Sequence, residues 1–542
     1  MVRINPGARS RTVTAGLVLA IALVTGGWLV ERGTRSGAVP TVAEAARLFD
    51  AVFSHVANNY VDSLGEPAMY RMAVEGMLYE LEDPYTRLLG PDKLGSLNET
   101  TSGNYAGIGV QADVRDGWIV VIAPSPGSPA ERAGIQPGDR IVEIDGKSTH
   151  GWTLEDAARA FRGKAGTSIS LQLERPGMAN AVPLTLSRKP LHRSAVRRVA
   201  MLPNAVGYID LKAFSDSSDR ELVGSVTALM ARGAKSLIID LRSNPGGLLE
   251  QGAAVADLFL EPGQKIVSLR GRIPEANRDF TDSTKQKWPG LPLTVLVDEK
   301  SASAAEIVAG ALQDHDRAVI IGESTYGKGS AQSVIPLGEI GGLKITTAKW
   351  YTPSGRSISR QLDRDQDAAP PDPSRERTRY RTSSGRIVYD GGGITPDLVA
   401  SDSAFSQQVR EFQTILGRRV VQFRDALTDY ARELKGTRGV ASQQFEVTPE
   451  MLDQVWERMT RRGVVMDRSI YDQYSAVAGQ LLAYDVARYA FGPEAEFRRR
   501  VAHDYAIKTA LELATGTTTQ QALLQKALAR QQTQESRATG RE

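Results

Sequence analysis

The residues best suited to chemistry are a serine and a lysine, Ser303 and Lys328. Ser303 stands among small residues in the segment 301–307, where an apolar run gives way to an expected helix. A helix start exposes backbone N–H groups with partial positive charge, so a serine there can attack a carbonyl while neighbouring amides hold the oxyanion. For this segment alone, an ordinary N-cap serine is the better interpretation.

Lys328 supplies the base that a serine nucleophile needs. It lies between Gly327 and Gly329, two glycines that let a side chain project from a tight backbone. Lysine serves as a base only if its pKa falls from about 10.4 towards 7, which burial or a positive field would cause. The segment also resembles part of a phosphate loop, but Gly329 stands where that loop requires Ser or Thr. The pair therefore favours a serine hydrolase over a nucleotide site.

Other polar residues sort by their distance from this pair. Glu306 follows Ser303 by one helical turn and is expected on the same face. Asp314 lies roughly 16 Å farther along a continuous helix, so we interpret it as structural. His315 has the same problem, which weakens a Ser–His hypothesis. Gln332 could orient the lysine amine if the loop bends back; otherwise it is an ordinary strand residue.

A glycine pair offers a partner for the oxyanion. Gly246 and Gly247 end an apolar run at the sheet edge where ligands usually bind. One of their N–H groups could complete an oxyanion hole with that of Ala304. The alternative interpretation is a simple turn.

Composition excludes several other classes of function. The chain has 542 residues, which predicts two to four domains, and a net charge of +3, which gives no basis for nucleic-acid binding. It has no cysteine, which excludes disulfides, thiolate catalysis and cysteine metal sites. None of its five histidines is spaced as a metal ligand pair, so we expect no metal and no cofactor.

The N-terminal residues have the pattern of a targeting segment. Arg3, Arg9 and Arg11 precede an apolar run from Val13 to Val30, the pattern of an export signal or anchor helix. No clear A-x-A cleavage site follows, so residues 1–35 predict an uncleaved transmembrane anchor. We expect a cell-envelope protein, anchored in the inner membrane with its catalytic part in the periplasm, or exported.

Along the rest of the chain, the pattern of apolar and polar residues changes several times. Residues 41–95 have a helical pattern of apolar residues. Gly and Ser become more frequent over 95–109, which indicates a domain boundary. Short β-runs with two helices follow over 103–189, typical of a small α+β module. From 205 onward, apolar runs alternate with helices, which predicts a layered α/β sheet with active residues on the loops after its strands. The expected strands are 236–241, 293–297 and 317–321, and the expected helices are 249–260 and 302–313. Residues 362–391 predict a surface loop, and 402–542 are helical in pattern with a frayed last dozen residues.

Several ordered motifs together resemble the carboxy-terminal processing proteases, the S41 group of serine peptidases. They are IIDLRSNPGG (238–247), SASAAEIVAGALQDH (301–315), YGKGSAQ (326–332), TTAKWYTPSGRSI (346–358) and GGITPD (392–397). The resemblance runs from about 45 to 398. It implies a multidomain fold in which an S41 core at 195–400, a layered sheet with flanking helices, carries a PDZ domain at 100–190. Helices at 41–95 precede them, and a helical extension at 402–542 follows.

On this resemblance, Ser303 is the nucleophile, Lys328 the general base and Gln332 the residue that holds the lysine. Ala304 with Gly246 or Gly247 would form the oxyanion hole, and Glu306 and Asp314 match family positions. Ala305 stands where the family usually has serine. In the PDZ domain, a loop would hold a peptide's free carboxylate through backbone amides, and Arg162 would couple this domain to the core. The loop residues are Gly107, Ile108, Gly109 and Val110.

The sequence thus predicts a serine endopeptidase that cleaves proteins after its PDZ domain has bound their C-termini. The alternative is a catalytically silent PDZ scaffold on the same fold, which the intact Ser303, Lys328 and Gln332 argue against. An α/β-hydrolase esterase would need a G-x-S-x-G elbow, which is absent around Ser303. Expected partners are protein or peptide substrates with free C-termini, the membrane, a second copy in a homodimer or higher oligomer, and an adaptor protein.

Overall fold

The computed structural model describes residues 41–360, 377–400 and 404–538. The chain divides into two compact units, Met1–Glu82 and Asp83–Glu542. The predicted anchor at 1–35 lies outside the described residues. Within the part that is described, no helix is long and apolar enough to cross a membrane.

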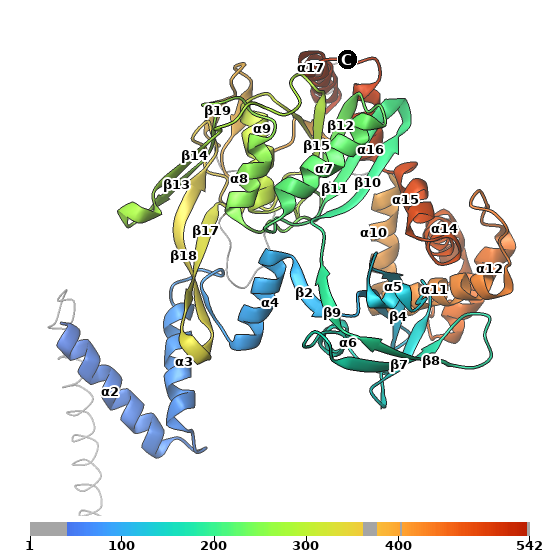
Figure 1. Ribbon diagram of the computed structural model, residues 1–542, viewed down its shortest axis with the longest axis horizontal. Helices are drawn as coiled ribbons and strands as arrows, with labels where there is room; N and C mark the ends of the chain where they lie inside the picture. Colours follow the sequence, from blue (N-terminus) through green and yellow to red (C-terminus); the bar gives the residue numbers. More distant parts are fainter. Residues whose placement is uncertain (1–40, 361–376, 401–403, 539–542) are drawn as a thin grey trace, which may run out of the picture. The chain divides into compact units, whose positions relative to one another are not determined.

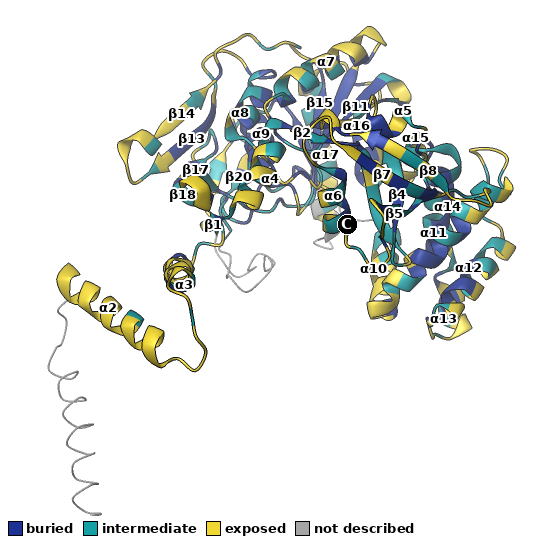
Figure 2. Cartoon of the chain, turned by 60° about the horizontal axis from the view of Figure 1, so that its bottom comes forward, coloured by how far each residue is buried: buried dark blue, intermediate teal, exposed yellow. Residues whose placement is uncertain are grey.

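The described residues of the first unit form two helices, α2 (Val42–Asn59) and α3 (Glu66–Tyr79). A capping box starts α2, because Thr41 and Glu44 each accept a hydrogen bond from the other's backbone N–H. No side chain of α2 is buried, and Figure 2 shows the helix as exposed along its length. The predicted helices are confirmed, and both leave apolar side chains exposed to water.

The second unit starts with β1 (Arg87–Leu89) and α4 (Pro91–Ser102). The expected boundary over 95–109 is partly wrong, because α4 continues through Gly95 to Ser102. Gly103 ends the helix in the left-handed conformation, with φ 72°. The glycine-rich composition there reflects the helix end and the loop after it.

The next residues form the expected small α+β module, called here the PDZ-like module (residues 104–192). Its main sheet has the strand order β3-β4-β5-β7-β8, and a separate antiparallel pair, β2 and β9, closes its base. Strand β3 lies at the edge of the sheet, so one side of it is open to a partner strand. The elements are β2 (Asn104–Gly107), β3 (Val110–Arg115), β4 (Trp118–Pro124), α5 (Pro129–Arg132), β5 (Arg140–Ile144), β6 (Lys147–Ser148), α6 (Leu154–Phe161), β7 (Ser168–Glu174), β8 (Val182–Ser187) and β9 (Lys189–His192).

A six-stranded sheet in the order β10-β11-β12-β15-β16-β21 forms the centre of the second unit. It is parallel from β11 onward, as the alternation of apolar runs and helices predicted. Its elements are β10 (Val196–Leu202), β11 (Val206–Leu211), α7 (Ser218–Ala231), β12 (Ser236–Asp240), α8 (Leu249–Asp257), β15 (Leu293–Val297), α9 (Ala304–Asp314), β16 (Val319–Gly322) and β21 (Leu398–Val399).

Both faces of this sheet are covered, which explains its continuous apolar strands. In β12, Leu237 and Ile239 pack with α7, α8 and α9, whereas Ile238 packs with helices from the C-terminal region on the opposite face. Figure 1 shows these two groups of helices on either side of the strands.

A second, antiparallel sheet lies beside the first and supplies residues to the candidate site. Its order is β1-β18-β13-β14, and β17 also pairs with β18. The bounds are β13 (Lys265–Gly271), β14 (Arg278–Thr281), β17 (Ser330–Pro336) and β18 (Gly342–Tyr351). The predicted surface loop at 362–391 contains a short hairpin of β19 (Arg379–Arg381) and β20 (Ile387–Tyr389), while 361–376 lie outside the described residues.

The C-terminal region is helical, as expected; of the last dozen residues, which were expected to fray, those up to Ala538 belong to the last helix and 539–542 lie outside the described residues. The helices are α10 (Ala404–Leu416), α11 (Val420–Thr437), α12 (Pro449–Arg461), α13 (Arg468–Gln473), α14 (Ser475–Phe491), α15 (Pro493–Val501), α16 (Tyr505–Ala514) and α17 (Gln520–Ala538). Helices α16 and α17 pack on the central sheet.

Helix α11 packs against the outer face of the PDZ-like sheet. Val120 of β4 is fully buried in the same apolar cluster as the C-terminal helices, whereas its neighbour Val121 belongs to the module's own core. Polar contacts flank this cluster: Arg432 Nε donates to Gly138 O at 2.7 Å, and Lys435 Nζ donates to Pro137 O at 2.5 Å. The module is therefore covered on a face that a small antiparallel sheet would otherwise expose.

Two matched substitutions test this packing. Val120→Ala and Val121→Ala remove the same two methyl groups from fully buried sites, so each should cost about 1–2 kcal/mol of unfolding free energy. Only Val120→Ala should also speed amide hydrogen exchange in α11, because only Val120 contacts the C-terminal helices. Equal exchange in α11 for both variants would contradict the packing.

Candidate functional site

Ser303 lies at the start of α9, immediately after the loop that leaves β15. Its backbone has φ 57° and ψ −116°, a conformation that costs a non-glycine residue roughly 1–3 kcal/mol. The side chain is partly exposed to a cavity, and the backbone N–H donates to Glu306 Oε2 at 2.8 Å. The strained turn therefore presents a serine at a helix N-terminus, as the sequence predicted.

Glu306 joins the Ser303 turn to the Lys328 loop. Its carboxylate is fully buried and also accepts hydrogen bonds from Gly327 N at 2.7 Å, Lys328 N at 2.9 Å and the Thr325 hydroxyl. Burial raises the pKa of Glu306, while these hydrogen bonds act in the opposite direction. A single side chain thus holds the backbone on both sides of the site.

Lys328 stands in an environment that disfavours its charge. Burial lowers its pKa to about 8, and the nearby positive charge of Lys344 acts in the same direction. Its Nζ lies 4.7 Å from the ring centroid of Tyr85, and its carbonyl oxygen accepts a hydrogen bond from Trp350 Nε1 at 3.0 Å. Part of the amine is therefore neutral near neutral pH, which is the form that can accept a proton.

Ser303 and Lys328 line the same cavity of about 650 Å³. Among the described residues, no hydrogen bond joins Ser303 Oγ to Lys328 Nζ. Glu250, Glu275, Arg278 and Lys344 supply further charges on the cavity wall, and the rest of the lining mixes apolar side chains with those of Ser, Thr and Gln residues. The apolar lining residues include Leu97, Phe214, Leu248, Leu269, Ile273 and Trp350. A cavity of this size and mixed lining can accommodate an extended peptide segment.

The glycine pair lies directly against the Ser303 turn, and the structure favours one of the two predicted oxyanion donors over the other. Gly246 N already donates to Asn244 Oδ1 at 2.8 Å, so it is not a free oxyanion donor. Among the described residues, the N–H groups of Gly247 and Ala304 have no protein acceptor. A Cβ on Gly246 would approach Ser303 Cβ to 2.7 Å, and one on Gly247 would approach Phe214 O to 2.1 Å. Both positions therefore require glycine, but for close packing as well as for a turn.

The remaining predicted site residues divide into near and distant ones. Gln332 lines the cavity, but its Nε2 donates to Ser330 Oγ at 3.0 Å and to Thr346 Oγ1 at 3.3 Å, and its role towards Lys328 stays a prediction. Asp314 lies at the far end of α9, where it pairs with the buried Arg356 at 2.7 Å. His315 follows it and contacts Lys265 O.

The predicted peptide loop of the PDZ-like module joins β2 to β3. In the described part of the chain, the N–H of Gly109 has no protein acceptor, and Gly107 pairs with Arg162 in an isolated antiparallel bridge. Gly109 has φ 76°, and a Cβ there would approach Ser128 Cβ to 2.3 Å, so the loop requires glycine. The loop can present the Gly109 amide to an anion at the open edge of β3.

Arg162 ends α6 and pairs with Glu99 of α4 at 3.4 Å. The same helix contributes Leu97, Thr100 and Thr101 to the cavity that Ser303 lines. Arg162 therefore connects the PDZ-like module to one wall of the candidate site.

Sequence reasoning missed three residues around Lys328. Tyr85 comes from the segment before β1, far from Lys328 in the chain, whereas Lys344 and Trp350 lie on β18, in the strand pair that follows Lys328. Only Trp350 stood in a quoted motif. No described group of three or more His, Cys, Asp or Glu side chains could hold a metal ion.

Comparison with known proteins agrees with this arrangement. The sequence matches peptidase family S41 over residues 205–368 and the PDZ domain over 120–175. It is 37% identical to the carboxy-terminal-processing protease of Bartonella bacilliformis, over 64% of this chain and 78% of that protein. The carboxy-terminal processing protease CtpA of Bacillus subtilis is 34% identical, over 57% of this chain and 66% of its own length. The carboxyl-terminal-processing protease of Synechocystis is 39% identical, over 53% and 67%.

The strain at Ser303 can be measured without any assay of function. Ser303→Gly should exceed Ser303→Ala in unfolding free energy by about 1 kcal/mol, because glycine adopts this backbone conformation without strain. Ser225 in the middle of α7 is the control, since Ser225→Gly should there be less stable than Ser225→Ala. The same order of stabilities at both positions, measured by denaturant unfolding, would contradict the strain.

Proposed function

The chain belongs to the carboxy-terminal processing serine proteases of peptidase family S41, and on that premise we propose that Ser303 and Lys328 form its catalytic dyad. The observation that carries the proposal is their shared cavity, which is lined both by a strained serine and by a lysine whose pKa is lowered to about 8. Glu306 supports it, because it holds both backbones.

The reaction follows from the chemistry of these groups. Ser303 Oγ attacks the peptide carbonyl carbon, and neutral Lys328 Nζ takes the hydroxyl proton as the C–O bond forms. The N–H groups of Ala304 and Gly247 stabilise the oxyanion. The Lys328 ammonium then returns a proton to the departing amine as the C–N bond breaks, which leaves an acyl-enzyme. Water attacks this ester with Lys328 again as base, and Ser303 is regenerated with release of the carboxylate.

Substrate capture is proposed for the PDZ domain. The amide of Gly109 would hold the free C-terminal carboxylate, and the open edge of β3 would pair with the peptide as an added strand. Arg162 would report this event to the cavity through α4.

We also propose where and in what state the protein works. The basic and apolar residues within 1–35 support an anchor in the inner membrane with the protease part in the periplasm. The exposed apolar side chains of α2 and α3 support a homodimer or higher oligomer, and an adaptor protein is a further candidate partner.

The decisive test is cleavage of an unfolded reporter protein that ends in an apolar, free C-terminus. Ser303→Ala and Lys328→Ala should each abolish cleavage while the fold is retained, because one removes the nucleophile and the other the base. Lys300→Ala, which removes an exposed lysine from the preceding loop, is the control and should cleave at the wild-type rate. A reporter with an amidated C-terminus should be cut more slowly if the PDZ domain reads the carboxylate. Undiminished cleavage by Lys328→Ala would rule out the dyad.

The pH dependence provides a separate test of the base. Because neutral Lys328 must accept the proton, kcat/KM should rise with pH through about 8 and level off above it. Lys344→Gln removes a positive charge that lowers the pKa of Lys328. The pKa should therefore rise, the ascending limb should move to higher pH, and activity at pH 7 should fall. Lys349→Gln, an exposed position on the same strand, should leave the limb in place. An unmoved limb in Lys344→Gln would show that Lys328 is not the titrating group.

A further inference from the structure

The C-terminal helices contact the back of the loop that carries the oxyanion amide. This loop, residues 242–247, follows β12 and ends in the two glycines beside Ser303. Its first residue, Arg242, forms an ion pair with Asp504 at 2.9 Å. Asp504 stands between α15 and α16, in the region after 402 to which the sequence motifs assign no function.

The 242–247 loop is bound to the Ser303 turn at several points. Ser243 N donates to Asp298 Oδ1 at 2.8 Å, and Asn244 O accepts from Ala302 N at 2.9 Å. Gly246 and Gly247 then pass within van der Waals contact of Ser303, Ala304 and Phe214. A displacement of Arg242 would therefore shift the backbone that presents the Gly247 N–H.

Arg242 is held from two sides. Its guanidinium forms an ion pair with the buried Asp240 of β12 at 2.7 Å, and that carboxylate also accepts a hydrogen bond from Tyr208. These contacts come from the central sheet itself. Among the described residues, Asp504 is the only side chain of the C-terminal helices that pairs with this loop.

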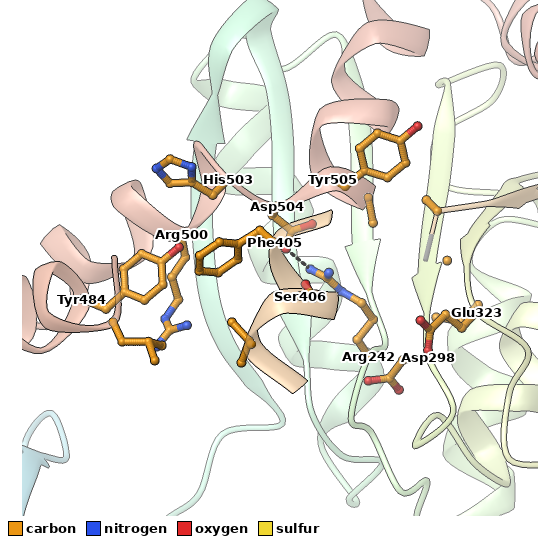
Figure 3. Close-up of a pocket in the computed structure, with 16 residues that line it drawn as sticks. Arg242, Asp298, Glu323, Phe405, Ser406, Tyr484, Arg500, His503, Asp504 and Tyr505 are labelled. Carbon is orange, nitrogen blue, oxygen red and sulfur yellow. Dashed lines mark ion pairs between the residues drawn. The ribbon is translucent and has the colours of Figure 1, made fainter. Parts of the chain in front are cut away.

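The surroundings leave room for movement. Arg242 and Asp504 lie in a cavity of about 440 Å³ between the ends of the central strands and the C-terminal helices. Figure 3 shows the pair meeting across this space, with Asp298 and Glu323 on the side of the core and Tyr484 and Arg500 on the side of the helices. The ion pair joins the two sides there, next to the apolar contacts that α16 makes with the central sheet.

We infer that Asp504 is a positioning residue for catalysis, which acts through Arg242 to hold the 242–247 loop and its oxyanion amide in place. The inference rests on the proposed function of Ser303 and Gly247. It assigns to the C-terminal helices a part in the reaction rate although none of their described residues lines the cavity of Ser303. Complete removal of an oxyanion donor costs about 100- to 1,000-fold in kcat, so a loosened donor should cost less.

The test uses Asp504→Asn in the full chain. Asp504 also caps α16, because its Oδ1 accepts from Ile507 N at 3.0 Å, whereas its other oxygen faces Arg242. Asparagine caps helices as well as aspartate does, so the variant keeps the cap and loses the charge. The control is Glu494→Gln, which breaks an ion pair of the same kind between α15 and Arg198 of β10, away from the loop.

In Asp504→Asn, kcat for the reporter should fall about 3- to 10-fold with little change in KM, and amides of residues 242–248 should exchange faster. In Glu494→Gln, neither quantity should change, although both variants should unfold at similar denaturant concentrations. Unchanged exchange in the loop, or faster exchange with an unchanged kcat, would overturn the inference. If the wild type cleaves nothing, the proposed function fails, and the exchange measurement still decides whether Asp504 holds the loop.

Discussion

The buried carboxylate of Glu306 is the interaction on which the site depends. It accepts hydrogen bonds from the Ser303 backbone and from the backbone of Gly327 and Lys328, so it fixes the nucleophile turn and the base loop to each other. Removing a buried charge of this kind would leave N–H groups without acceptors, which costs more than the bonds themselves contribute. The helix turn that carries Ser303 thus also carries the group that positions Lys328. The spacing of three residues between Ser303 and Glu306 places both at this one turn.

Much of this arrangement could be predicted from local sequence. The alternation of apolar runs and helices predicted the parallel sheet, because each strand buried on both faces must be apolar throughout. Glu306 was placed correctly on the face of Ser303 by helical spacing alone, and the distance along α9 correctly separated Asp314 from the site. Ser303 and Lys328 were found as residue types at loops after strands, where a parallel sheet collects its functional groups.

What could not be predicted depends on contacts between distant segments. The side chain of Asn244 determines which glycine N–H stays free, and the lowered pKa of Lys328 depends on burial and on Lys344 of the neighbouring strand β18. The full length of helix α4 was not predicted, because the helix is polar in composition and contains Gly95. One signal was overlooked: β4 contains consecutive apolar residues including Val120, which indicates a strand covered on both faces.

That covered face changes how the PDZ domain can influence catalysis. The domain is held on its outer face by α11 and at its base by the contact of Arg162 with α4. Strand β3 also contacts α11, because Arg115 Nε donates to Thr428 Oγ1 at 3.3 Å. Because the outer face is packed on α11, a swing of the whole domain would have to break an apolar cluster. A small displacement of α6 and Arg162 breaks only one partly exposed ion pair, which costs less free energy. A structural change caused by peptide binding would therefore reach the cavity more easily through α4.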